Sequence, residues 1–221
     1  MRAFLTGTDT GVGKTFATAL LARALRRSGL DAIALKPVCS GDRSDARILR
    51  SAGGDELTLD EVNPLWFPLP VAPLVAARAE NRDISIPALA DWFRKVSAGR
   101  KSVLVEGAGG WLAPVAKGAC VADLCAAFAL PVIVVVANRL GCVNHTLLTL
   151  ESIRARGLAC RGIILNTIRP SPDDSARTNR ALLEEFTNVP VILEISPGQS
   201  ELAGFTPGLR PGSISKLQGG H

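Results

Sequence analysis

A glycine-rich segment near the start of the chain has residue types that suit phosphate binding. Residues 6–15, which we call the phosphate loop, read Thr-Gly-Thr-Asp-Thr-Gly-Val-Gly-Lys-Thr and stand between a predicted strand and a predicted helix. The glycines allow backbone N–H groups to converge on phosphate oxygens, Lys14 can bridge the outer phosphates, and the Thr15 hydroxyl can ligate Mg²⁺. Five residues separate Gly7 from Gly13, one more than in the common form of this motif. The segment predicts binding of a nucleoside triphosphate.

Two charged residues directly follow buried strands predicted at 32–35 and 102–105. They are Lys36 and Glu106, and Glu106 is followed by Gly-Ala-Gly-Gly, which permits a ligand to approach closely. In a doubly wound sheet, ligands bind beyond the carboxyl ends of the strands. We therefore expect Lys36 to lie near Lys14, where two positive charges would favour an anionic reactant. The alternative for Lys36 is a solvated residue at the end of a strand.

Three acidic residues are candidates to complete a Mg²⁺ site with Thr15. This ion prefers a few hard oxygen ligands together with phosphates and water. Glu106 suits the role because it follows a buried strand and precedes Gly-Ala-Gly-Gly, which permits close approach to a ligand. Asp45 is the second candidate, although it could instead be an acid in the first turn of a helix, and Asp42 is its rival.

Two further segments follow predicted strands. Residues 140–145, Leu-Gly-Cys-Val-Asn-His, open a helix, so their amides could hold an anion such as a carboxylate; the alternative is an ordinary helix start. Asn166 ends the next strand, where its amide could bond the edge of a base or cap a turn.

Buried strands and amphipathic helices alternate along the chain and must position these residues. Apolar runs rich in Val and Ile predict strands at 3–6, 32–35, 102–105, 132–137, 162–165 and 189–195. Helical patterns lie between them at 15–28, 86–96, 121–130, 144–156 and 175–186. This alternation predicts an α/β fold with a doubly wound, mainly parallel sheet and helices on both faces.

Two segments interrupt the alternation. Residues 63–73 carry four prolines, which predicts an ordered loop that is either a substrate wall or a connector. Residues 196–221 are rich in Gly, Pro and Ser and predict an irregular tail. We therefore expect one catalytic domain over residues 1–195, followed by this tail.

Composition excludes several classes of protein. The 221 residues carry a net charge of +5, but the basic residues are scattered among acids, so we expect no nucleic-acid partner. The longest apolar run has nine residues, against the roughly 20 that cross a bilayer, and no signal peptide precedes the phosphate loop, so we expect a cytoplasmic protein without a membrane partner. Five widely spaced cysteines predict reduced thiols rather than a metal site.

The motifs, taken in order, resemble those of the dethiobiotin synthetase family, the ATP-dependent carboxylases that close the ureido ring in biotin synthesis. Between residue 6 and about 168 they are Gly-Thr-Asp-Thr-Gly-Val-Gly-Lys-Thr, Lys-Pro-Val-Cys-Ser-Gly, Ser-Asp-Ala, Val-Glu-Gly-Ala-Gly-Gly-Trp, Leu-Gly-Cys-Val-Asn-His and Leu-Asn-Thr. The resemblance implies a P-loop NTPase-like fold, a ligase that uses ATP and Mg²⁺, and a homodimer whose active site lies at the subunit interface.

The resemblance also implies a substrate and a reaction. The substrate would be 7,8-diaminononanoate, one amine of which reacts with CO₂ to form a carbamate. The carbamate attacks the γ-phosphate of ATP to give a carbamic-phosphoric anhydride, and the second amine then displaces phosphate. The products would be dethiobiotin, ADP and phosphate.

Individual residues receive roles from the same resemblance. Lys36 would bind the carbamate and stabilise the transferring phosphoryl group, Lys14 would bridge the phosphates and the carbamate, and Thr10 would be a further catalytic residue. ATP would be bound by Gly11, Val12, Gly13, Lys14, Thr15, Phe16, Asp45, Glu106, Gly107, Ala108, Gly109, Asn166 and Thr167. Mg²⁺ would be held by Thr15, Asp45 and Glu106. Ser40 would contact the substrate, whose carboxylate would be received by Leu140, Gly141 and Asn144 of the other subunit.

Two alternatives remain. A nucleotide-switch ATPase of the MinD or ParA kind shares the fold, but such proteins usually carry an extra lysine early in the phosphate loop, where this chain has Thr8, Asp9 and Thr10. A related ATP-dependent ligase could act on another small substrate. The resemblance assigns neither the adenine contacts near residues 195–197 nor the tail after residue 198.

Overall fold

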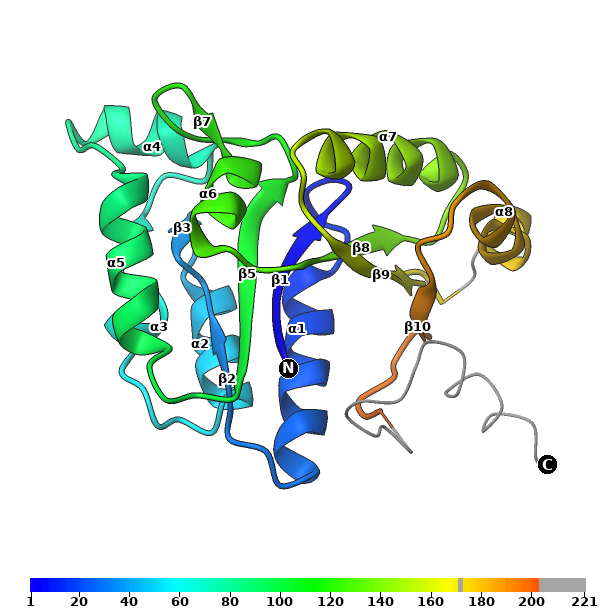
Figure 1. Cartoon of the computed structure of the whole chain (residues 1–221), viewed down its shortest axis with the longest axis horizontal. Helices are drawn as coiled ribbons and strands as arrows, with labels where there is room; N and C mark the ends of the chain where they lie inside the picture. Colours follow the sequence, from blue (N-terminus) through cyan, green and yellow to red (C-terminus); the bar gives the residue numbers. More distant parts are fainter. Residues whose placement is uncertain (171–172, 203–221) are drawn as a thin grey trace.

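A six-stranded parallel sheet forms the centre of the computed structural model, which describes residues 1–170 and 173–202 (Figure 1). Its strands lie in the order β10-β9-β8-β1-β5-β2, and every neighbouring pair is parallel. Their bounds are β1 (Arg2–Gly7), β2 (Ala32–Leu35), β5 (Ser102–Gly110), β8 (Val132–Ala137), β9 (Cys160–Asn166) and β10 (Val191–Ile195). The predicted parallel sheet is confirmed.

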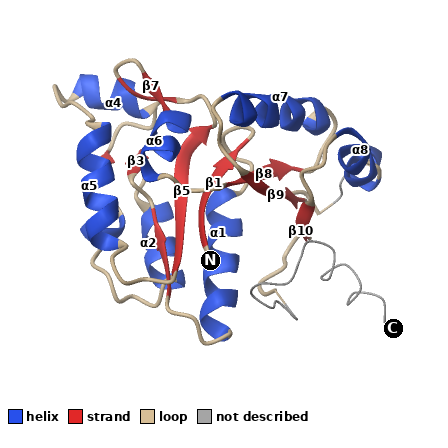
Figure 2. Ribbon diagram, in the orientation of Figure 1, coloured by secondary structure: helices blue, strands red, loops and turns tan. Residues whose placement is uncertain are grey.

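Helices cover both faces of the sheet (Figure 2), because its strands are apolar on both sides. Phe4 of β1 packs with the core that includes Phe93 and Phe128, whereas the next residue, Leu5, packs with the core that includes Leu25 and Leu49. The helices are α1 (Lys14–Arg27), α2 (Ser44–Ala52), α3 (Leu59–Val62), α4 (Pro73–Ala79), α5 (Ile86–Val96), α6 (Val121–Phe128), α7 (Cys142–Ala155) and α8 (Asn179–Phe186), with the 3₁₀ turn η1 (Asp174–Arg177) before α8. The doubly wound α/β fold is confirmed.

Several local expectations were wrong. The loop predicted at 63–73 contains the strand β4 (Leu65–Phe67), which pairs in parallel with β3 (Val38–Ser40) in a separate two-stranded sheet. Prolines flank these three residues without interrupting them, so their backbone N–H groups remain available for pairing. The alternation pattern also missed α2, α3 and α4, and the helix predicted at 175–186 is divided into η1 and α8.

The other small elements are β6 (Pro114–Ala116) and β7 (Ala119–Cys120), which form an antiparallel pair.

Residues 196–202 contain no helix or strand, and the rest of the predicted tail, 203–221, lies outside the described residues. In the part of the chain that the structure describes, every helix is too short or too polar to cross a membrane.

The assignment of the hydrophobic core can be tested through a matched pair of phenylalanines, one buried and one exposed. Phe128 is 5% exposed and stacks on Phe93 with ring centroids 4.6 Å apart, whereas Phe186 is 63% exposed. We expect Phe128→Ala to lower the free energy of unfolding by about 3–5 kcal/mol, because it opens a cavity in the core. Phe186→Ala should change it by less than about 0.5 kcal/mol. Urea denaturation of both variants measures this, and equal losses would contradict the assignment of the core.

Candidate active site

The phosphate loop connects β1 to α1 in a conformation that requires glycine. Gly11 and Gly13 have φ angles of 75° and 85°, in the left-handed region that other residues rarely adopt. A side chain at Gly13 would also collide with the amide of Asn166, whose Nδ2 donates a hydrogen bond to the carbonyl of Val12 at 3.0 Å. Asn166, at the end of β9, therefore holds the loop from across the sheet.

Lys14 lies folded over this loop. Its Nζ donates to the carbonyl of Asp9 at 3.0 Å, and the residue is 7% exposed. Burial and, to a smaller extent, the positive charge of Lys36 together lower the pKa of Lys14 to about 8, against smaller opposing effects of Glu106 and Asp45. Among the described residues, Lys14 forms no ion pair, so its charge is available to an incoming anion.

Lys36, directly after β2, and Glu106, within the adjacent strand β5, form a buried ion pair. Lys36 Nζ donates to Glu106 Oε1, to Asp45 Oδ2 at 3.0 Å and to the carbonyl of Gly107 at 3.4 Å. The Thr15 hydroxyl donates to the same Glu106 Oε1 at 2.9 Å. Lys36 is therefore not a solvated strand end: it is 3% exposed, and Glu106 is fully buried.

The charges in this cluster fix the protonation of its members. Burial alone would lower the pKa of Lys36, but the negative charges of Glu106 and Asp45 outweigh it and raise that pKa above its ordinary value. Burial would likewise raise the pKa of Asp45, but the charge of Lys36 and the hydrogen bonds from Lys36 and Thr15 together outweigh it and lower that pKa. Lys36 therefore remains a cation and Asp45 an anion at neutral pH.

One oxygen of the cluster has no partner. Glu106 Oε2 is buried and accepts no hydrogen bond among residues 1–170 and 173–202. A buried, unpartnered carboxylate oxygen is costly unless a cation or donor satisfies it. With Asp45 and the Thr15 hydroxyl beside it, this oxygen fits a Mg²⁺ ion that takes its other ligands from phosphate and water. The described residues hold no cluster of three or more Asp, Glu, His or Cys, and all five cysteines are free.

The structure separates the two rival acids. Asp42 lies on the surface, where its Oδ1 accepts from the backbone N–H of Ser44 at 3.0 Å and pairs with Arg47 at 3.4 Å. Asp45, in the first turn of α2, points to Lys36 instead. Of the two, Asp45 is therefore the one placed at the cluster.

The end of β5 lies against the phosphate loop. The strand continues to Gly110, beyond the predicted end at 105, because the N–H of Trp111 donates to the carbonyl of Gly7 at 3.1 Å and Gly110 pairs with Gly7. A side chain at Gly107 would lie 2.8 Å from Val121, and one at Gly109 would lie 3.7 Å from the exposed Thr10 hydroxyl. The predicted nucleotide residues Gly107, Ala108 and Gly109 thus run beside the loop.

Comparison with known proteins identifies the family. The sequence profile described as "AAA domain" matches residues 1–202. The ATP-dependent dethiobiotin synthetase BioD of Akkermansia muciniphila is 45% identical over 200 residues, which cover 90% of this chain and 94% of that protein. The BioD of Anaeromyxobacter dehalogenans is 46% identical over 189 residues, 84% of this chain and 85% of that protein. The chain is a member of the dethiobiotin synthetase family.

Structural similarity supports the same fold over a greater evolutionary distance. The septum site-determining protein MinD of Pyrococcus horikoshii, solved with Mg-ADP, superposes with a TM-score of 0.55 over 90% of this chain and 82% of that one. The two sequences are 18% identical, so the likeness concerns the fold alone.

The remaining residues that dethiobiotin synthetase motifs single out lie outside the ion cluster. Phe16 is 40% exposed in the first turn of α1, and the N–H of Thr167 donates to the carbonyl of Ile195 at 2.8 Å. Ser40, at the end of β3, donates from its hydroxyl to the carbonyl of Val71 at 2.5 Å. Leu140, Gly141 and Asn144 are exposed around the start of α7. Within the described chain, no hydrogen bond connects these three residues to Lys14, Lys36 or Glu106.

Sequence reasoning missed two buried asparagines near these strand ends. Asn138 follows β8, and its backbone N–H donates to the carbonyl of Asn166 at 2.9 Å. Its position directly after a buried strand is the same signal that marked Asn166. Asn63 donates to the carbonyl of Lys36 at 2.7 Å, and nothing in its proline-rich surroundings indicated this contact.

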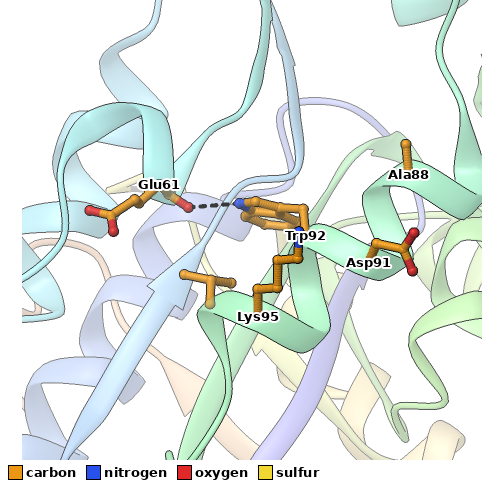
Figure 3. A pocket seen from close by; sticks show the side chains of 6 residues that line it. Glu61, Ala88, Asp91, Trp92 and Lys95 are labelled. Atoms are coloured by element: carbon orange, nitrogen blue, oxygen red, sulfur yellow. Dashed lines mark hydrogen bonds between the residues drawn. The ribbon is translucent and has the colours of Figure 1, made fainter.

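A separate surface groove lies between α3 and α5 (Figure 3), where Trp92 Nε1 donates to the main-chain carbonyl of Glu61 at 3.1 Å. The side chains lining it belong to none of the predicted site residues: Glu61, Ala88, Asp91, Trp92, Lys95 and Val96. The candidate site is therefore defined by the strand ends and not by this groove.

The buried ion pair yields a prediction about stability. Lys36→Met leaves the fully buried Glu106 without its cation and should lower the free energy of unfolding by about 3–5 kcal/mol. The double variant Lys36→Met/Glu106→Gln should recover at least half of that loss, because it removes both charges. Urea denaturation of the single and double variants forms a double-mutant cycle. Strictly additive effects would show that the two side chains are not coupled.

Proposed function

We propose that this dethiobiotin synthetase family member catalyses the carboxylation and ring closure of 7,8-diaminononanoate with CO₂, with conversion of ATP to ADP and phosphate. The observation that carries the proposal is the convergence of Lys36, Glu106, Asp45 and Thr15 beside the phosphate loop. Relatives named ATP-dependent dethiobiotin synthetase, aligned over most of the chain, support the same reaction.

ATP and Mg²⁺ would be held by the segments that meet at the strand ends. Gly11 to Phe16 and Gly107 to Gly109 would bind the nucleotide, Asn166 and Thr167 would contact its base, and Thr15, Asp45 and Glu106 would hold the metal. When bound, Mg-ATP supplies the phosphoryl group and neutralises charge as that group is transferred. The unpartnered Glu106 oxygen and the glycine conformations of the loop support this placement.

The lysines suit the chemistry of an amine that must become a carbamate. Only a neutral amine attacks CO₂, and an alkyl amine has a pKa of about 10 in water. Positive charge at Lys14 and Lys36 favours the neutral amine and then binds the anionic carbamate. Lys36, kept protonated by its two carboxylates, orients the carbamate and stabilises the transferring phosphoryl group. We assign Thr10, which is exposed beside Gly109, to contact with the same group.

The remaining substrate contacts come from two places. Ser40 contacts the diamine from the end of β3. Leu140, Gly141 and Asn144 receive the substrate carboxylate across the interface of a homodimer, which accounts for a helix start that is exposed in the single chain. We assign the catalytic domain to residues 1–195 and propose that the enzyme acts in the cytoplasm on small molecules, without a nucleic-acid or membrane partner.

The reaction can be tested by its stoichiometry. Phosphate release from Mg-ATP with bicarbonate should require 7,8-diaminononanoate, and mass spectrometry should find one dethiobiotin for each phosphate. Release that is independent of the diamine and stimulated by DNA or lipid would instead identify a nucleotide-switch ATPase. Release with a different small acid or diamine, and no dethiobiotin, would identify a related ligase.

Nucleotide binding should take up a proton at alkaline pH. Because the pKa of Lys14 is about 8 in the free protein, most Lys14 side chains are neutral at pH 8.5, and a bound phosphate raises that pKa again. Mg-ADP binding should therefore take up about 0.5–0.8 proton at pH 8.5 and almost none at pH 6.5. Calorimetry in buffers of different ionisation enthalpy measures the uptake. Lys14→Arg, which stays charged, is the control; equal uptake in that variant would exclude Lys14 as the source.

A further inference from the structure

Asn63 is a fully buried side chain with every polar group bonded. It follows α3, and its Nδ2 donates to the carbonyl of Lys36 at 2.7 Å and to that of Leu65 at 3.0 Å. Its Oδ1 accepts from Arg43 Nε at 2.9 Å. A buried amide with both donors and its acceptor satisfied holds its neighbours in one arrangement, because each lost bond leaves an unsatisfied group.

The main chain of Lys36 is held by hydrogen bonds to Val62 and Asn63. Pairing of β2 with β5 extends through Leu35 and Val105, so Lys36 lies one residue beyond the ladder. Its N–H donates to the carbonyl of Val62 at 2.9 Å, and its C=O accepts from the Asn63 amide. Both polar groups of the Lys36 backbone are therefore held by residues 62 and 63, and not by a neighbouring strand of the central sheet.

The other contact of Asn63 leads to the helix that carries Asp45. Arg43 immediately precedes α2, and its side chain is 15% exposed. Besides the bond to Asn63 Oδ1, Arg43 Nη2 donates to the main-chain carbonyl of Asn63 and to Asp60 Oδ1, each at 2.6 Å. Its guanidinium carbon also lies 5.7 Å from the ring centroid of Trp66. Asp45 is in the first turn of the same helix.

We propose that Asn63 is a positioning residue for the reaction, which fixes the Lys36 ammonium relative to Asp45 and Glu106 by bonding the backbone of Lys36 on one side and Arg43 on the other. The inference rests on the proposed function. A long lysine side chain reproduces one geometry only if its backbone is fixed, and a displacement of about 1 Å at a reacting group can cost about 100-fold in rate.

The test uses Asn63→Asp, which keeps the size of the side chain and its acceptor toward Arg43 but replaces the amide donor toward Lys36. We expect kcat for dethiobiotin formation to fall about 10- to 100-fold, while KM for Mg-ATP stays within about threefold, because the phosphate loop is not touched. Ser97→Ala is the matched control: it removes a buried hydroxyl that accepts from Arg2 at 2.8 Å near the opposite ends of the strands. Its kcat should stay within about twofold of wild type.

A spectroscopic measurement separates positioning from loss of stability. The chain has six lysines, so the side-chain ¹³Cε and ¹⁵Nζ signals can be assigned with single Lys→Arg variants. The Lys36 signals should shift in Asn63→Asp and not in Ser97→Ala. An unchanged kcat, a parallel loss of kcat and nucleotide binding, or an unchanged Lys36 signal would each overturn the proposal.

Arg43→Ala provides a second variant should Asn63→Asp fail to fold. This variant keeps the bonds that the Asn63 amide donates but removes the guanidinium that donates to Asn63 Oδ1. We therefore expect a smaller loss of kcat, about three- to tenfold, with the same shift of the Lys36 signals. Wild-type kcat and Lys36 signals in Arg43→Ala would overturn the proposal. If wild-type protein forms no dethiobiotin, it is the proposed function that fails, and the Lys36 signals alone then decide whether Asn63 positions Lys36.

Discussion

The buried ion pair between Lys36 and Glu106 is the interaction on which the candidate site depends. Burying a carboxylate and an ammonium costs several kcal/mol for each ion, and the cost is offset only by close contact and additional hydrogen bonds. The fold supplies that contact through strand register: Leu35 of β2 pairs with Val105 of β5, so Lys36, just beyond β2, and Glu106, within β5, lie at the same level. Asp45 and Thr15 complete the hydrogen bonds from α2 and α1.

The same arrangement gives the two lysines different electrostatic properties. Lys36 has two carboxylate partners, which raise its pKa, so it is a permanent cation of fixed position. Lys14 is buried without an ion-pair partner in the described chain, and its pKa of about 8 leaves its charge responsive to a bound anion. One lysine is thus suited to orienting a reactant, and the other to responding to phosphate. A site that handles a neutral amine, a carbamate and phosphate in turn needs both behaviours.

Local patterns predicted the components of the site better than their contacts. Continuous apolar runs revealed β1, β2, β5, β8, β9 and β10 because strands buried on both faces need apolar residues throughout. Lys36 and Glu106 were found because each follows such a strand. That β2 pairs with β5, however, is a matter of strand order, which no local pattern contains.

The contacts that the sequence did not reveal are tertiary. Asn63 holds Lys36 across 27 residues of chain, through a segment whose prolines indicated only a loop. The helix α2, which carries Asp45, is short, and the sequence pattern did not distinguish it from the loops on either side. The role proposed for residues 140–144 would require a second copy of the chain, so neither the sequence pattern nor one subunit can place them against a substrate.

A single-turnover experiment on Lys36→Met tests the central claim most directly. Folded variant and wild type would each be mixed with Mg-ATP, ¹³C-labelled bicarbonate and 7,8-diaminononanoate, and labelled dethiobiotin would be followed beside the affinity for Mg-ADP. If Lys36 acts on the carbamate and the transferring phosphoryl group, labelled product should fall at least 100-fold while Mg-ADP affinity stays within about fivefold. Product formation near the wild-type rate would contradict that role, and so would an equal loss of nucleotide binding.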